Sequence, residues 1–177
     1  TPILIKYKFD SSIIQIECGF RHSLFLTLNG TVYGSGINTN FQLTKDYTFN
    51  NDHRIGKLYD NVIRIGCCMD ASYVLTNNNM LLTVGSNTKY QLGRKTDYHA
   101  LVFTKIDSDI RVKLFNCGDQ HVGLISTDNK AYTFGDDSMG QLGNGESLFE
   151  DTNKIHHLKS KEQVMDIKCG DMHTIMK

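Results

Sequence analysis

Residues 117–121 read Cys-Gly-Asp-Gln-His, and similar stretches recur along the chain about every 50 residues. Each copy begins with a cysteine that ends a short apolar segment: Cys18, Cys67, Cys117 and Cys169. In three copies the cysteine is followed by glycine, and a histidine stands three positions after it: Gly19 with His22, Gly118 with His121, and Gly170 with His173. The second copy has Cys68 and Ala71 at these places. Such self-similarity at a fixed period predicts a repeat architecture.

A second anchor recurs with the same period. Its glycines are Gly36, Gly85 and Gly135, and each is followed six residues later by a Gln-Leu pair that begins at Gln42, Gln91 or Gln141. The block between the two anchors has no insertions, whereas the stretch from Gln-Leu to the next cysteine varies in length. Constant length in one half and variable length in the other indicate packed units joined by surface loops.

The constant block shows strand signals. Residues 23–28 and 31–33 flank an Asn29-Gly30 pair, which is a strong signal for a tight β-hairpin. The other copies have asparagine or aspartate at the same turn, and both residues tolerate the backbone angles that such turns need. A weaker fourth strand is expected at 55–58, 101–106 and 154–158. Four antiparallel strands in about 50 residues correspond to one blade of a β-propeller.

The predicted fold is therefore all-β, a partial β-propeller of about 3.5 four-stranded blades. The units span about 13–58, 62–106 and 112–158, a fourth begins at 164–177, and residues 1–5 form a leading strand. A sheet that begins and ends inside a blade exposes unpaired strand edges. We therefore expect the rest of a propeller, or a second copy of the chain, to close the ring.

Composition limits the function classes. The 177 residues have zero formal net charge, so no general electrostatic attraction draws the chain to nucleic acid or to an anionic membrane. No apolar run is long enough to span a membrane. Cysteines about 50 residues apart do not match a zinc pattern, and we predict that they fill equivalent small buried positions. A vicinal disulfide between Cys67 and Cys68 is the alternative. We predict no metal, no cofactor, and a reducing location in the cytoplasm or nucleus.

The first copy resembles the regulator of chromosome condensation repeat. The resemblance lies in the residues from Gly19 to Ser23, in Asn29-Gly30-Thr31-Val32-Tyr33 and in Gln42-Leu43. The third copy, with Gly140-Gln141-Leu142-Gly143, resembles it more closely. The resemblance implies a seven-bladed propeller, of which this chain is part. WD-type and kelch blades are excluded, because the chain has no tryptophan and no Gly-Gly pair. Light sensing through tryptophans, known in this family, is excluded for the same reason.

The chain also departs from the family pattern. The usual tryptophan before the second glycine is replaced by Ser35, Val84 or Phe134. Phe41, Thr44 and Tyr90 stand where the family has glycines beside Gln-Leu. These replacements affect the expected function of single blades more than the expected fold.

The repeated histidines suggest two readings. They recur once per blade and so lie around a ring, which does not match a catalytic triad. In the structural reading, each histidine fixes a turn by hydrogen bonds. In the functional reading, which the resemblance implies, the Gly-x-x-His loops form a partner-binding face. Its expected contact residues are Arg21, His22, Asp70, Asp119, Gln120, His121, Asp171, Met172 and His173. The expected structural anchors are Cys18, Gly19, Gly36, Gln42, Cys67, Gly85, Gln91, Cys117, Gly118, Gly135, Gln141, Cys169 and Gly170.

The resemblance implies a protein–protein interaction platform without catalytic activity of its own. The alternative is a guanine-nucleotide exchange factor for a small Ran-like GTPase, as the founding member of the family is. Exchange in that member needs a wedge-like β insertion. The nearly constant unit lengths show no obvious insertion here, and the alternative that the wedge lies in blades outside this sequence stays open. Chromatin binding in the founding member uses a basic tail, which is absent from this chain.

Overall fold

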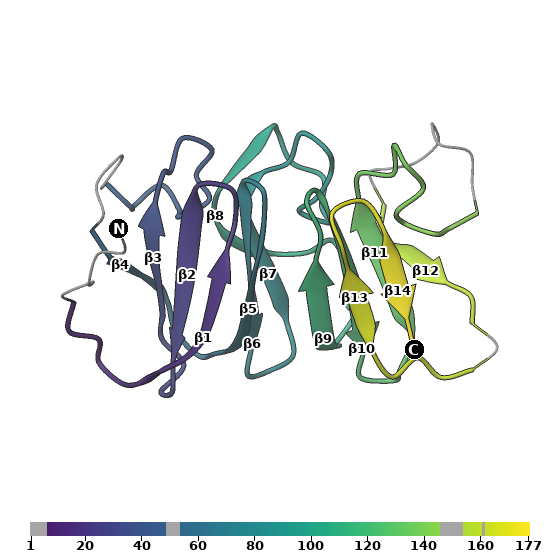
Figure 1. Ribbon diagram of the computed structural model, residues 1–177, viewed down its shortest axis with the longest axis horizontal. Helices are drawn as coiled ribbons and strands as arrows, with labels where there is room; N and C mark the ends of the chain where they lie inside the picture. Colours follow the sequence, from purple (N-terminus) through teal and green to yellow (C-terminus); the bar gives the residue numbers. More distant parts are fainter. Residues whose placement is uncertain (1–6, 49–53, 146–153, 161) are drawn as a thin grey trace.

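The computed structural model describes residues 7–48, 54–145, 154–160 and 162–177. Within these residues all regular structure is β, arranged as three four-stranded sheets and one two-stranded sheet that stand side by side (Figure 1). Blade 1 contains β1 (Ile13–Cys18), β2 (His22–Thr27), β3 (Val32–Gly36) and β4 (Gly56–Tyr59). Blade 2 contains β5 (Val62–Cys68), β6 (Ala71–Thr76), β7 (Leu81–Ser86) and β8 (His99–Lys105). Blade 3 contains β9 (Val112–Cys117), β10 (His121–Ser126), β11 (Ala131–Gly135) and β12 (His156–Leu158), and blade 4 contains β13 (Ile167–Cys169) and β14 (Thr174–Met176).

Each four-stranded blade is an antiparallel meander in which the strands follow one another in chain order. The predicted all-β partial propeller is confirmed, and the strand after each repeat cysteine lies where the sequence predicts it. The weak fourth strand is present in all three blades. Compared with the expected bounds, β4 lies one residue later, β8 begins two residues earlier and β12 begins two residues later. The expected leading strand at 1–5 falls outside the described residues.

The hydrophobic core lies between the blades. Leu24 and Leu26 of blade 1 pack against Ile65 and Val74 of blade 2, and all four side chains are at most 2% exposed. A second cluster joins blades 2 and 3 in the same way, and a third joins blades 3 and 4. Full burial of each aliphatic side chain contributes about 2 kcal/mol. The blades are therefore held mainly by contact with their neighbours, as in other repeat proteins.

The second anchor is glycine for a geometric reason. Gly135 has a φ of +113°, which L side chains rarely adopt, and an added Cβ would lie 2.5 Å from the carbonyl oxygen of Gln120. The next amide, at Asp136, donates to that same carbonyl over 2.9 Å. Gly36 and Gly85 have the same conformation and the same kind of close contact. The backbone at this anchor therefore leaves no room for a side chain.

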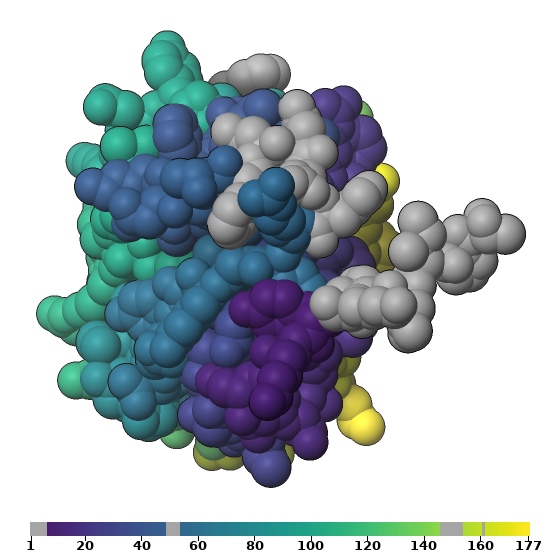
Figure 2. Space-filling model, turned by 90° about the vertical axis from the view of Figure 1, so that its left-hand side faces the viewer, coloured from purple at the N-terminus to yellow at the C-terminus, as the bar shows by residue number. Residues whose placement is uncertain are grey.

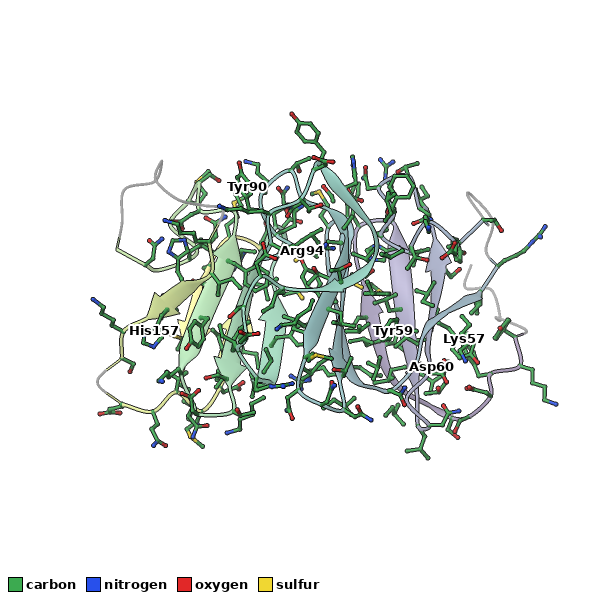
Figure 3. The ribbon with its side chains drawn as sticks, turned by 180° about the vertical axis from the view of Figure 1, so that it is seen from behind. Lys57, Tyr59, Asp60, Tyr90, Arg94 and His157 are labelled. Atoms are coloured by element: carbon green, nitrogen blue, oxygen red, sulfur yellow. The ribbon has the colours of Figure 1, made fainter. Side chains whose placement is uncertain are left out.

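The Gln-Leu pair belongs to a self-capping loop. In blade 2 the side-chain oxygen of Gln91 accepts from the Lys89 amide over 2.8 Å, and the side-chain oxygen of Asn87 accepts from the Leu92 amide over 3.0 Å. Blades 1 and 3 repeat both bonds with their equivalent residues. Tyr90 lies in this loop, near the upper edge of the molecule in Figure 3, with a φ of +57°. The loop keeps its shape although the glycine before Gln-Leu is replaced in two of its three copies, by Phe41 and Tyr90.

This conformation predicts a stabilising substitution. Thr44 is β-branched and has a φ of +71°, whereas its equivalents Gly93 and Gly143 have a φ of +60° and +62°. Thr44→Gly is therefore expected to raise the free energy of unfolding by about 1 kcal/mol, measured by urea denaturation. The reverse change, Gly143→Ala, has no atom within 4 Å of the new Cβ, so it is expected to lower that free energy by a similar amount. A destabilised Thr44→Gly variant would contradict this reading.

Candidate partner-binding face

The Gly-x-x-His loops lie at one end of the blades, at the top in Figure 1, where β1 turns into β2 and β13 into β14. Backbone hydrogen bonds link each loop to the next one. The amide of Phe20 donates to the carbonyl of Met69 over 2.9 Å, that of Met69 to Asp119 over 2.8 Å, and that of Asp119 to Asp171 over 3.2 Å. Four loops about 50 residues apart in sequence are thus held in one continuous row, which we call the loop row.

The side chains of the loop row are unequally exposed. Phe20 is 64% exposed and Met172 is 50% exposed, and the guanidinium of Arg21 lies 5.0 Å from the centre of the Phe20 ring. Asp171 is exposed as well, whereas Asp70, Asp119 and Gln120 are half-buried. Large exposed apolar and charged groups on a fixed backbone are suited to contact with another protein.

Three carboxylates gather in the row. Partial burial raises the pKa of Asp119, and the nearby negative charges of Asp171, Asp70 and Asp136 raise it further, against a hydrogen bond from Gln120. Gln120 also donates to the sulfur of Met69 over 3.8 Å. The centre of the row therefore has a higher density of carboxylate groups than the chain as a whole, whose formal net charge is zero.

His22 and His121 lie beneath this face, not on it, at 3% and 0% exposure. The Nε2 atom of His22 lies 2.9 Å from the hydroxyl of Ser72 in the next blade, and that hydroxyl donates to the Gln42 carbonyl over 2.7 Å. Because the hydroxyl proton is used there, His22 is the donor in the first bond. His121 makes the same bridge through Thr174 to Gln141, at 3.0 and 2.8 Å. We call this arrangement the histidine–hydroxyl bridge.

Both bridges need neutral imidazoles. Burial lowers the pKa of His22 to about 4, and it also lowers the pKa of His121. The Nδ1 atoms of both rings are buried and have no hydrogen-bond partner within the described part of the chain. A proton on Nδ1 would therefore be buried without an acceptor. The sequence suggested that each histidine fixes its own turn, but the bond crosses to the next blade, and spacing within one repeat could not reveal this.

The glycine of Gly-x-x-His makes room for the ring. A Cβ at Gly118 would lie 2.2 Å from Cε1 of His121, and Gly19 and Gly170 are in the same situation with their own histidines. Blade 2 has changed the whole arrangement: Cys68 replaces the glycine, Ala71 the histidine, and Val122 of the next blade the hydroxyl. The phenol of Tyr73 donates to the Gln91 carbonyl over 2.7 Å instead. These departures from the repeat pattern compensate one another.

All five cysteines are free thiols. Cys67 and Cys68 are buried, Cys117 and Cys169 are half-buried, and Cys18 is exposed, so the predicted common buried position applies to only part of the set. Burial raises the pKa of Cys67 and Cys117, and it raises the pKa of Cys169 to about 11. Thiols in such surroundings are poorly ionised and chemically inert.

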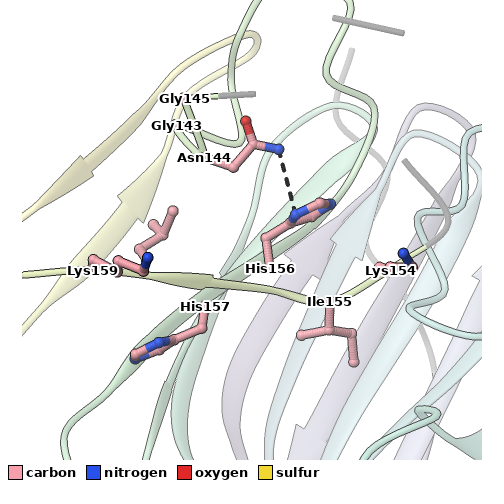
Figure 4. Close-up of a pocket in the computed structure, with 9 residues that line it drawn as sticks. Gly143, Asn144, Gly145, Lys154, Ile155, His156, His157 and Lys159 are labelled. Carbon is pink, nitrogen blue, oxygen red and sulfur yellow. Dashed lines mark hydrogen bonds between the residues drawn. The ribbon is translucent and has the colours of Figure 1, made fainter. Parts of the chain in front are cut away.

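Two of the cavities adjoin the loop that follows β11 in the third blade. One, of about 420 Å³, is bounded by the loop at 143–145 and the segment around β12, and the amide of Asn144 meets the His156 ring there over 3.4 Å (Figure 4). It contains none of the expected contact residues. The other, of about 200 Å³, is lined by Met172 and His173 together with Met139 and Gly140, and so adjoins the loop row. In the described ranges no group of three or more His, Cys, Asp or Glu side chains could hold a metal ion. Nor does any helix there have the length and apolarity to cross a membrane.

Comparison with known proteins agrees with the repeat. The family model described as "Regulator of chromosome condensation (RCC1) repeat" matches residues 13–42 and, in a second form, residues 128–176. The human probable E3 ubiquitin-protein ligase HERC6 is 29% identical over 99% of this chain, and the human probable E3 ubiquitin-protein ligase HERC3 is 30% identical over 98% of it. The chain spans only 18% and 17% of the length of these two relatives.

Solved structures show the same fold. Human WBSCR16 matches with a TM-score of 0.80 at 19% identity, over 93% of this chain and 44% of that one. Prp20p from Saccharomyces cerevisiae, whose structure was described with its binding to Gsp1p and histones, matches with a TM-score of 0.79 at 18% identity, over 93% of this chain and 43% of that one. The chain therefore forms somewhat less than half of a propeller of this size.

Proposed function

Since the chain belongs to the regulator of chromosome condensation repeat family, we propose that it is a protein-interaction platform whose binding surface is the loop row. The contact residues in this proposal are Arg21, Asp70, Asp119, Gln120, Asp171, Met172 and His173, the last of which is exposed. His22 and His121 support them from below. The free cysteines fit a reducing compartment, so the proposal places the protein inside the cell.

The observation that carries the proposal is the continuous row of backbone hydrogen bonds between the four loops. Binding surfaces gain affinity when the contact groups are ordered before the partner arrives, because less conformational entropy is lost on binding. The loop row holds an aromatic ring, an arginine, a methionine and several carboxylates in fixed relation. Aromatic, methionine and arginine side chains are enriched at protein–protein interfaces.

Nucleotide exchange on a small GTPase is the alternative function that the family resemblance implies. The strand elements and the connections in the described ranges contain no extra β insertion that could act as a wedge. We therefore propose binding without exchange for this part of the propeller.

A photo-cross-linking experiment tests the surface. A benzophenone amino acid is placed at Phe20, which is 64% exposed in the loop row, or at Leu28, which is 69% exposed beyond the opposite end of β2. Irradiation in cell extract is expected to give discrete protein adducts from position 20 and few from position 28. Asp171→Arg, combined with the probe at position 20, is expected to reduce those adducts at least about tenfold, because it reverses a charge in the row.

Adducts of equal yield from the two positions, or adducts from position 28 alone, would show that the loop row is not the binding surface. The alternative function is examined with purified small GTPases that carry a fluorescent nucleotide. Faster nucleotide release in the presence of the chain would show that the chain acts as an exchange factor, and the proposal of binding without exchange would be wrong.

A further inference from the structure

Blade 2 has two exposed tyrosines in the connection that follows β7. Tyr90 is 41% exposed and Tyr98 is 76% exposed. Blade 2 packs against blade 1 on one side and against blade 3 on the other, so this exposure does not depend on what precedes or follows the sequence. In Figure 2 the teal residues of this part of the chain project at the upper left of the molecule. We call residues 87–98 the tyrosine loop.

The backbone of Tyr90 adopts an unfavourable conformation. Its φ of +57° lies in the left-handed region, which bulky L side chains rarely adopt, whereas the equivalent residue of blade 3 is Gly140. Phe41 of blade 1 has the same kind of φ, but its ring lies 6.1 Å from that of His99. Within the described residues Tyr90 has no such ring contact, and its hydroxyl has no hydrogen-bond partner. Strain that the fold itself does not use points to contact with another molecule.

Asn87 holds the tyrosine loop in one shape. Asn87 is 4% exposed, its amide donates to the Tyr98 carbonyl over 2.7 Å, and its carbonyl accepts from the Tyr90 amide over 3.1 Å. Its side chain accepts from the Leu92 amide over 3.0 Å and donates to the Arg94 carbonyl over 3.2 Å. The two rings therefore project from a fixed backbone. Tyrosines held in this way bind with little loss of conformational entropy.

The tyrosine loop adjoins the loop row. The Nζ atom of Lys89 lies 3.2 Å from the carboxylate of Asp136 in blade 3. The amide of Asp136 donates over 2.9 Å to the carbonyl of Gln120, which belongs to the loop row. The two surfaces thus form one continuous face on blades 2 and 3.

The positive charges of the tyrosine loop are paired, turned inward or balanced. Lys89 is paired with Asp136, and the guanidinium of Arg94 donates to the Thr83 carbonyl over 2.9 Å. Lys95 and Asp97 are both exposed and have opposite charges. The tyrosine loop therefore has no net positive charge to offer to an anionic partner.

The adjoining part of the loop row is negative. Partial burial raises the pKa of Asp119, and the charges of Asp171, Asp70 and Asp136 raise it further. A positive group from a partner would relieve this repulsion. Nucleic acid and anionic membranes would instead add to it.

We propose that Tyr90 and Tyr98 anchor a partner protein through a segment in which arginine or lysine side chains alternate with apolar ones. The apolar side chains of that segment pack on the two rings, and its cations lie beside the carboxylates of Asp70 and Asp119. A cation also interacts favourably with the face of a tyrosine ring. This inference rests on the proposed function, because it extends the binding surface from the loop row to the tyrosine loop.

A random dodecapeptide library displayed on phage tests the chemistry of the partner. Phage that bind a Tyr90→Gly, Tyr98→Ser double variant are removed first, and the remainder is selected on the purified 177-residue chain. The surviving peptides therefore need the tyrosine loop. They are expected to be rich in arginine, lysine and apolar residues and poor in aspartate and glutamate.

Fluorescence anisotropy of a synthetic selected peptide measures the contribution of each residue. Tyr90→Gly and Tyr98→Ser are each expected to weaken binding at least about tenfold, as truncation of aromatic anchors does at other interfaces. Thr44→Gly, which changes a residue of the corresponding loop in blade 1, and Leu28→Ser, beyond the opposite end of β2, are the matched controls. Both are expected to leave the affinity unchanged.

Urea denaturation separates a contact role of Tyr90 from a structural one. Because Tyr90→Gly relieves a positive φ, its urea midpoint is expected to be no lower than that of the wild type, although binding weakens. A lower midpoint together with weaker binding would show a structural role and overturn the proposal. A library that yields no peptide after subtraction, peptides without enrichment in basic residues, or an affinity that Tyr90→Gly leaves unchanged would also overturn it.

The cross-linking probe at Phe20 distinguishes failure of this inference from failure of the proposed function. If position 20 gives its discrete adducts while the peptide experiments fail, the loop row remains the binding surface and the tyrosine loop is not part of it. If position 20 gives no adducts either, the proposed function itself is wrong.

Discussion

Gly118→Ala is expected to lower the free energy of unfolding by about 3 kcal/mol. The new Cβ would lie 2.2 Å from Cε1 and 2.5 Å from Nδ1 of His121, so the ring must leave its place. Overpacking of this kind costs about 1–3 kcal/mol, and loss of the bond to Thr174 adds about 1 kcal/mol or more. Urea denaturation followed by circular dichroism measures the loss, because the chain has no tryptophan for fluorescence.

The matched control is Gly118→Ala combined with His121→Ala, which resembles the natural pair of Cys68 and Ala71. We expect the double variant to be more stable than Gly118→Ala alone, although a contact of the new Cβ with the Gly170 carbonyl at 2.6 Å remains. Gly140→Ala has no atom within 4 Å of its new Cβ and is expected to cost only about 1 kcal/mol for its positive φ. A double variant as unstable as the single one would show that the imidazole is not what excludes the Cβ.

Acid is expected to destabilise the chain through His22. Its pKa is about 4 in the folded chain and 6.5 in the unfolded chain, so the unfolded state binds the proton more tightly. The stabilisation is complete above pH 6.5 and is lost as the pH falls towards about 4. The shift corresponds to about 3 kcal/mol. His121, whose pKa is also lowered by burial, adds a loss in the same direction.

Urea denaturation at a series of pH values from 7.5 to 4 tests this expectation. His22→Ala is expected to be less stable at pH 7 but to lose less stability on acidification than the wild type. His157→Ala, which removes an exposed histidine of β12, serves as the matched control. Parallel profiles for the wild type and His22→Ala would show that His22 does not titrate with a lowered pKa.

The blade architecture could be predicted from the sequence because its determinants lie within one repeat. The hairpin at Asn29-Gly30 and the glycine at Gly135 are local requirements of turn and backbone geometry, and both recur at fixed spacing. The loop at Phe41 and Tyr90 also kept its form, although the glycines expected there are missing. Neighbouring contacts over-determine that backbone, so a local departure from the pattern did not change the fold.

The candidate face was harder to predict from the sequence than the blade architecture. Placing His22 and His121 among the contact residues follows from their position in an exposed type of loop, but both rings turn inward to the next blade. Their partners lie 50 and 53 residues away, outside the repeat in which the motif was recognised. A usable signal was nevertheless present: hydroxyls at 72 and 174 accompany histidines in the preceding copy, and Val122 accompanies Ala71.

The altered junction between blades 2 and 3 has a consequence for how such repeats can diverge. If a hydroxyl is replaced by valine first, a buried imidazole loses its partner; if a glycine is replaced by cysteine first, the ring is displaced. If histidine is replaced by alanine first, only a cavity forms, and the hydroxyl keeps its bond to the glutamine carbonyl, as Ser72 does with Gln42. The least costly route from the ancestral junction to that of Cys68, Ala71 and Val122 therefore begins with loss of the histidine. Related chains that have made only this first change should have alanine at the equivalent of Ala71, glycine at the equivalent of Cys68, and serine or threonine at the equivalent of Val122.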